Sequence, residues 1–153
     1  MHRVISRRGT LEVVAGSLVG AAMPKVSFAE NQSLGSIAAR NGFVFGAAAG
    51  PVIDKDAAYR QLYVDHAKII TTDVALKMSH VAPKPGDKTY GEADRLLRFC
   101  NDNKIPMRGH CLIWNEWVPA WIKNLSSAER EKFFDSYIEE VVGRYAGQLH
   151  SWD

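Results

Sequence analysis

From residue 43 onward, short apolar runs alternate with longer amphipathic segments. Residues 43–50 form an apolar run next to glycines, and residues 69–74 combine two Ile with two Thr, a composition typical of strands. Residues 106–114 form a third run, and residues 149–153 begin a fourth. The pattern predicts a buried β-strand in each of these four places.

The segments between the runs have the period of amphipathic helices. Asp54 is placed to cap a first helix over residues 55–68. The residues of that helix expected to face inward are Ala58, Leu62 and Ala67. A second helix, predicted to end near residues 101–103, has apolar residues at helical spacing. This stripe consists of Ala93, Leu96, Leu97 and Cys100.

The last helix has the clearest start signal. Ser126 and Glu129 have the spacing of a capping box, in which each side chain accepts a hydrogen bond from the other residue's backbone N–H. Gly147 is placed to stop the helix. Its predicted apolar face consists of Phe133, Phe134, Tyr137, Ile138, Val141, Val142 and Tyr145.

Alternation of strands and helices predicts an α/β fold with parallel strands and helical crossovers. Four strands and three helices could complete a small open domain or form the first half of a (β/α)8 barrel, which takes roughly 250 residues. Because the pattern stops inside a strand at residue 153, with no closing helix, we expect the first half of such a barrel. The uncovered edges of a half barrel would favour self-association.

Residues 1–29 have the features of an export signal. A basic start is followed by an apolar stretch over residues 13–23 and by Ser27-Phe28-Ala29, with small residues at the two positions a signal peptidase reads. Ser6-Arg7-Arg8-x-x-Leu11 resembles the twin-arginine signal, which predicts a bacterial protein exported to the periplasm or the outside. The apolar stretch is too short to span a membrane, so residues 30–153 form the predicted mature domain.

Composition and charge exclude several classes of protein. With 46% hydrophobic and 24% charged residues, the chain is an ordinary globular sequence, and two cysteines cannot make a disulfide framework. The net charge is +2, but residues 1–29 contain four basic residues and one acidic residue. The rest of the chain therefore has a slight negative balance, which argues against a nucleic-acid partner.

The richest chemistry lies in residues 108–121, where three of the four tryptophans fall within eight residues. In parallel α/β proteins, the end of a strand and its following loop are where sites are built. Indole rings stack on the C–H faces of sugars, and His110 and Asn115 could supply hydrogen bonds beside them. Alternatively, the tryptophans are core packing and His110 is a satisfied buried imidazole. Spacing alone does not decide between these readings.

This window also carries a family resemblance. Arg108-Gly-His-x-Leu-x-Trp114, followed by Pro119-x-Trp121, resembles the third-strand signature of glycoside hydrolase family 10, the endo-xylanases. Other blocks of that family resemble segments of this chain in the same order. These segments are Phe45-Gly46-Ala47, residues Thr72 to Pro83, and Ser151-Trp152-Asp153.

The resemblance implies a (β/α)8 barrel that hydrolyses β-1,4-xylan with retention, using two carboxyl groups about 5–5.5 Å apart. It places sugar ligands at Lys77, His110 and Trp114, although Lys77 taken alone would be read as a solvated surface lysine. In the family, the acid/base Glu lies four residues beyond the position of Asp153, and the nucleophile lies later still. We therefore expect these 153 residues to hold neither catalytic carboxylate and to be inactive alone.

Several positions depart from the family pattern. Its Glu-Asn pair is Asp73-Val74 here, and the Trp after the lysine is Met78. Its His and Gln after the third-strand Trp are Asn115 and Trp117. Val74 cannot hydrogen-bond a hydroxyl, so the outer sugar contacts and the substrate preference are expected to differ from those of ordinary xylanases.

Two other functions fit parts of the sequence. The tryptophan cluster suits a non-catalytic carbohydrate-binding module, and the twin-arginine signal suits a small exported α/β protein with a cofactor. We nevertheless expect no cofactor and no metal, because no His or Cys pair has a ligand spacing. Cys100 and Cys111 are predicted to be buried thiols.

Replacing both Arg7 and Arg8 by Lys tests the export signal. The twin-arginine pathway reads the guanidinium pair, so the variant precursor should stay in the cytoplasm, as fractionation and immunoblotting would show. Unchanged export would contradict the twin-arginine assignment and leave a general secretory leader.

Overall fold

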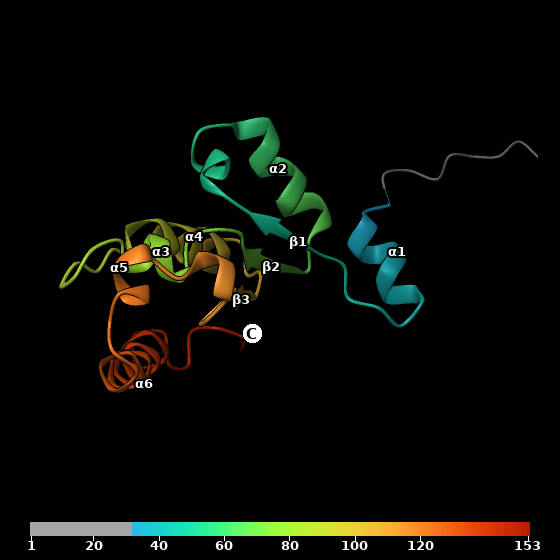
Figure 1. Ribbon diagram of the computed structural model, residues 1–153. Helices are drawn as coiled ribbons and strands as arrows, with labels where there is room; N and C mark the ends of the chain where they lie inside the picture. The colour runs from blue at the N-terminus through green and yellow to red at the C-terminus, as the bar shows by residue number, and fades with distance from the viewer. Residues whose placement is uncertain (1–31) are drawn as a thin grey trace, which may run out of the picture. The chain divides into compact units, whose positions relative to one another are not determined.

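Four short parallel strands form one sheet in the order β1-β2-β3-β4 (Figure 1). The computed structural model describes residues 32–153, so the predicted export signal lies outside the described residues. The strands are β1 (Gly46–Ala49), β2 (Ile69–Thr72), β3 (Met107–Gly109) and β4 (Ser151–Trp152). The helices are α1 (Leu34–Arg40), η1 (Pro51–Asp54), α2 (Ala57–His66), α3 (Met78–Val81), α4 (Gly91–Asp102), η2 (Asn115–Trp117), α5 (Ala120–Lys123) and α6 (Ser127–Arg144).

All three strand pairs are parallel, which confirms the α/β prediction. Gly46 of β1 pairs with Ile69 of β2, Thr71 of β2 with Arg108 of β3, and Gly109 of β3 with Trp152 of β4. Helices α2, α4 and α6 lie in the crossovers between successive strands. The four carboxyl ends therefore meet at one edge of the sheet, where ligands of parallel α/β proteins bind.

The two later helices form as predicted. All four residues of the α4 stripe are buried. At the start of α6, the Ser126 side chain accepts from the Glu129 backbone N–H, and the Glu129 carboxylate accepts from that of Ser126 at 2.9 Å. Tyr137, Val141 and Tyr145 are the fully buried members of the apolar face, whereas its other members are half-buried.

The first crossover helix differs from the prediction. Pro51 starts the short 3-10 helix η1, which takes up Asp54, and α2 begins only at Ala57 with Asp56 as its cap. The face turned inward is also offset by one residue from the predicted one, which moves it by about 100° around the helix axis. Tyr63 is therefore buried. Of the three residues expected inward, Ala67 is buried, but Ala58 and Leu62 are exposed.

A polar cluster joins α4 to α6. The Asp94 carboxylate accepts from the Arg144 guanidinium at 2.6 Å and from the Tyr145 hydroxyl at 2.8 Å. Glu140 accepts from Lys88 and from the Tyr90 hydroxyl, and the hydrogen bond from Lys88 lowers the pKa of that carboxyl. Because the chain runs from α6 directly into β4, these contacts help fix the fourth strand beside the third.

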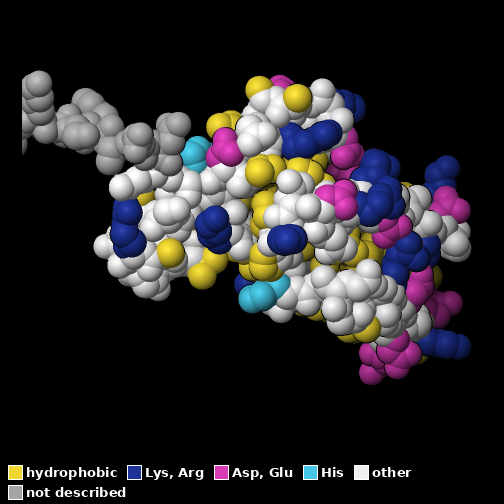
Figure 2. Space-filling view, turned by 180° about the vertical axis from the view of Figure 1, so that it is seen from behind, with side chains coloured by type: hydrophobic (Ala, Val, Ile, Leu, Met, Phe, Trp, Pro, Cys, Tyr) yellow, Lys and Arg dark blue, Asp and Glu magenta, His cyan; other side chains and the backbone are white. Residues whose placement is uncertain are grey.

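Charges on the surface are mixed. On the face shown in Figure 2, basic and acidic side chains are interspersed and apolar side chains gather between them. Within residues 32–153, β1 and β4 each have a single neighbouring strand, and Phe43 and Val44 are strongly exposed. Self-association through this uncovered surface stays a prediction. No helix in the described part is long and apolar enough to cross a membrane.

Gly109 and Gly143 form a matched pair for testing the sheet. A Cβ on Gly109 would overlap the Trp152 indole across the β3–β4 pair, whereas one on Gly143 of α6 would meet nothing. Gly109→Ala should lower the free energy of unfolding by about 1–3 kcal/mol through overpacking. Gly143→Ala should raise it by about 0.5–1 kcal/mol, because Ala loses less backbone entropy in a helix. Urea unfolding measures both, and equal effects would contradict the β3–β4 packing.

Candidate functional site

Lys77, His110 and Trp114 come together at the carboxyl ends of β2 and β3. The Lys77 ammonium nitrogen lies 5.0 Å from the centre of the Trp114 ring. The rings of His110 and Trp114 have their centres 6.1 Å apart. The parallel order of the strands produces this meeting, since Lys77 follows β2 and the two aromatic residues follow β3. The structure thus groups all three residues that the family resemblance singled out.

Lys77 is not a solvated surface lysine. Its side chain is only 7% exposed, and its ammonium nitrogen lies 4.2 Å from the ring centre of Trp117 in addition to its contact with Trp114. Such cation–π contacts contribute about 0.5–2 kcal/mol each and offset part of the cost of removing the charge from water. A cation–π contact uses no oxygen lone pair, so the ammonium N–H groups can still donate to a ligand oxygen. Lys77 is therefore a hydrogen-bond donor whose position at the carboxyl edge of the sheet is fixed by the two indole rings.

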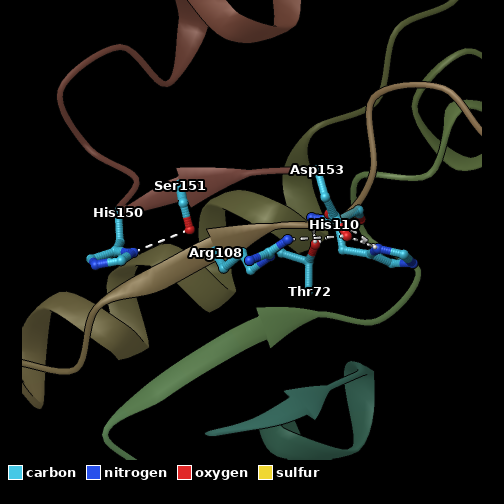
Figure 3. Close-up of polar contacts among 6 residues, drawn as sticks. All are labelled: Thr72, Arg108, His110, His150, Ser151 and Asp153. Carbon is cyan, nitrogen blue, oxygen red and sulfur yellow. Dashed lines mark hydrogen bonds and ion pairs between the residues drawn. The ribbon is translucent and has the colours of Figure 1, made fainter. Parts of the chain in front are cut away.

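His110 is anchored by its neighbours in the sheet. The Nδ1 atom of its ring lies 3.1 Å from one carboxylate oxygen of Asp153 and 3.2 Å from the other (Figure 3). Arg108 reaches the same carboxylate at 3.4 Å. In the neutral ring, an Nδ1 atom that donates to Asp153 leaves Nε2 as an acceptor, because a neutral imidazole carries one proton. The side chain is 29% exposed, so a ligand can reach it.

The tryptophan cluster divides into two parts. Trp114 is 37% exposed and stands beside His110 and Lys77, whereas Trp117 is half-buried against Lys77. Trp121 instead donates its indole N–H to the Ala82 carbonyl at 3.1 Å and packs edge-on against Phe133. Trp121 is thus a packing residue. The cluster therefore contains both a residue of the candidate site, Trp114, and a residue of the core, Trp121.

Three contacts of the site were missed by sequence reasoning. They are the Asp153 carboxylate on His110, the Trp117 ring on Lys77, and a double hydrogen bond between the Thr72 hydroxyl and the His110 backbone. The parallel strand order predicts the contact between Asp153 and His110, because it places the carboxyl ends of β3 and β4 side by side. Among the departures from the family pattern, Asp73 and Asn115 are exposed and Val74 is half-buried.

Cys111, next to His110, is a poor candidate for a nucleophile. Its thiol is buried, and this burial raises its pKa. Cys100 is also buried, and its pKa is raised to about 12. Both buried thiols were predicted from the sequence. Within residues 32–153, no three His, Cys, Asp or Glu side chains gather as a metal ion would require.

Parallel strands in consecutive order, with helical crossovers, match part of the (β/α)8 barrel of the solved structures described next. Residues 33–153 match glycosyl hydrolase family 10, and the chain belongs to that family. A psychrophilic family 10 endo-β-1,4-xylanase superimposes with a TM-score of 0.73 and 29% identity, over 80% of this chain and 40% of that one. Xylanase XynB from Paenibacillus barcinonensis superimposes with a TM-score of 0.72 and 27% identity, over 82% of this chain and 39% of that one.

Curated relatives include proteins of two kinds. The endo-1,4-beta-xylanase/feruloyl esterase of Xylanibacter ruminicola is 30% identical, over 94% of this chain and 21% of the relative. The anti-sigma-I factor RsgI6 of Acetivibrio thermocellus is 31% identical, over 81% of this chain and 17% of the relative. The chain thus spans about a fifth of the length of these two relatives and about 40% of the solved chains.

Thiol labelling tests the chemistry assigned to Cys111. At pH 8, a buried thiol with a raised pKa holds little thiolate, so Ellman's reagent should label neither cysteine of the folded protein at the rate seen in urea. Rapid labelling of Cys111 in the folded chain, located by peptide mass spectrometry, would contradict this and reopen a nucleophilic role. Cys100 serves as the internal control, because it lies on α4 away from the carboxyl edge.

Proposed function

We propose that Lys77, His110 and Trp114 form the inner sugar-binding subsite of an endo-1,4-β-xylanase barrel and bind β-1,4-xylan or a related polysaccharide. The observation that carries the proposal is the convergence of Lys77, His110 and Trp114 at the carboxyl edge of the sheet. Membership of family 10 and likeness to solved xylanases support the substrate class.

Each of the three side chains suits a part of a sugar ring. The Lys77 ammonium donates to hydroxyl oxygens, and its contacts with two indoles limit where it can point. The His110 Nε2 atom accepts from a hydroxyl while Asp153 holds Nδ1. The exposed Trp114 ring offers an apolar face for the sugar C–H groups. Together these groups recognise both the polar edge and the flat face of a pyranose.

Hydrolysis needs more than this subsite. A retaining glycosidase uses one carboxyl group as acid/base and another as nucleophile, about 5–5.5 Å apart. Asp153 contacts His110 and Arg108, and the family resemblance gives it neither role. By the family resemblance, the acid/base and the nucleophile belong to later strands. We therefore propose that residues 1–153 bind the sugar without cleaving it.

A second candidate function is carbohydrate binding alone. The exposed Trp114 ring beside His110 and Lys77 favours it, because a sugar can stack on an indole without any catalytic carboxyl group. In this case the same three side chains hold the sugar, and no later strand is needed for the activity. The two candidates share their site and differ only in whether a barrel completed by further strands hydrolyses xylan.

We also propose that the protein works outside the cytoplasm. A soluble endo-acting xylanase meets its polymeric substrate only after export, and residues 1–29 have the features of a bacterial export signal. On the face shown in Figure 2, basic and acidic side chains are interspersed, without a broad basic field of the kind that attracts nucleic acid.

His110→Ala and His150→Ala form a matched pair for testing the site. His150 is exposed at the amino end of β4, away from the carboxyl edge (Figure 3). In calorimetric titration with xylotriose, His110→Ala should bind about tenfold more weakly, through loss of a hydrogen bond and its supporting network. His150→Ala should bind like the wild type. Equal losses in both variants, or none in either, would contradict the proposed site.

Reducing-sugar release from xylan decides the catalytic part. Wild-type residues 1–153 should release none, and joining them to the remaining strands of a family 10 barrel should restore turnover. Turnover by residues 1–153 alone would overturn the catalytic assignment. Binding without turnover in the joined protein would favour the carbohydrate-binding module instead.

A further inference from the structure

Thr72 stands where the backbone pairing of β2 and β3 stops. The paired residues of these strands end at Thr71 and Arg108, one position before Thr72 and two before His110. Beyond that point, the Thr72 hydroxyl connects β2 to the His110 backbone. It donates to the His110 carbonyl at 2.8 Å and accepts from the His110 backbone N–H at 2.8 Å. Figure 3 shows this side chain directed from β2 toward the His110 backbone.

This one hydroxyl satisfies both backbone polar groups of His110. Unpaired buried backbone groups are costly, so the two bonds stabilise the backbone of His110 in this position. The same residue is held at its ring by Asp153. His110 is therefore anchored from both neighbouring strands, its backbone by β2 and its imidazole by β4, which leaves few positions open to the Nε2 atom.

We propose that Thr72 is a positioning residue that directs the His110 imidazole toward the bound sugar. The inference rests on the proposed function for the role of His110, but the contact between the two residues is independent of it. Thr72 is fully buried and cannot itself touch a ligand. Its effect on binding is transmitted only through His110.

The chain provides matched variants for this test. Thr72→Val keeps the shape of the side chain but removes both hydrogen bonds, whereas Thr72→Ser keeps the hydroxyl and loses a methyl group. Thr71→Val makes the same chemical change one residue earlier. Thr71 is half-buried and its side chain leaves the opposite face of β2, because successive side chains of a strand alternate. In the sheet register, Thr71 pairs with Ala48 of β1 and Arg108 of β3.

Two measurements on the full chain separate positioning from plain stability. The first is calorimetric titration with xylotriose, and the second is the pair of His110 ring-nitrogen chemical shifts by long-range ¹H–¹⁵N correlation. Thr72→Val should weaken binding about tenfold and move the ring nitrogens away from the Nδ1–H tautomer held by Asp153. Thr72→Ser and Thr71→Val should keep the wild-type shifts and bind within about twofold of the wild type.

Several outcomes would overturn the proposal. A folded Thr72→Val protein with wild-type affinity and ring shifts would show that the hydroxyl serves stability alone. Equal losses in Thr72→Val and Thr71→Val would show a general effect on the strand. If Thr72→Val does not fold, Thr72→Ser decides, because changed His110 shifts with the hydroxyl kept would refute the hydrogen-bond argument. If wild-type protein binds no xylotriose, the proposed function fails, and the ring shifts still test Thr72.

Discussion

Parallel pairing of β2, β3 and β4 is the constraint on which the site depends. Helical crossovers bring each strand back in the same direction, so the carboxyl ends meet at one edge. Lys77, His110 and Asp153 follow or end three different strands and have no local reason to be near one another. Only the sheet order brings the ammonium, the imidazole and the carboxylate into one site.

Local signals predicted the parts of the fold whose structure is local. The α4 stripe and the capping box at Ser126 depend on residues three or four positions apart, and both formed as expected. The predicted start of α2 was wrong because Asp54 belongs to a short 3-10 helix that begins at Pro51. Asp56 is the residue that caps α2. The predicted inward face was also one residue out of phase, since Tyr63 is buried in place of Leu62.

The candidate site was only partly accessible to sequence reasoning. Residue types and order singled out Lys77, His110 and Trp114 through a family resemblance, yet nothing local showed that Lys77 is buried between two indoles. Equally, no pattern distinguished Trp114, which faces the site, from Trp121, which packs against Phe133. Thr72 reads as an ordinary strand residue until its hydroxyl is seen across the sheet from His110. Contacts between strands decide these roles, and sequence spacing does not encode them.

A chemical-shift map of the full chain during titration with xylotriose tests the central claim most directly. If the carboxyl edge of the sheet is a preorganised sugar site, the largest changes will cluster at Lys77, His110 and the indole N–H of Trp114, and will saturate together. Saturable changes confined to another surface, such as the apolar groove between Leu34 and Tyr59, would place the sugar elsewhere and contradict the account.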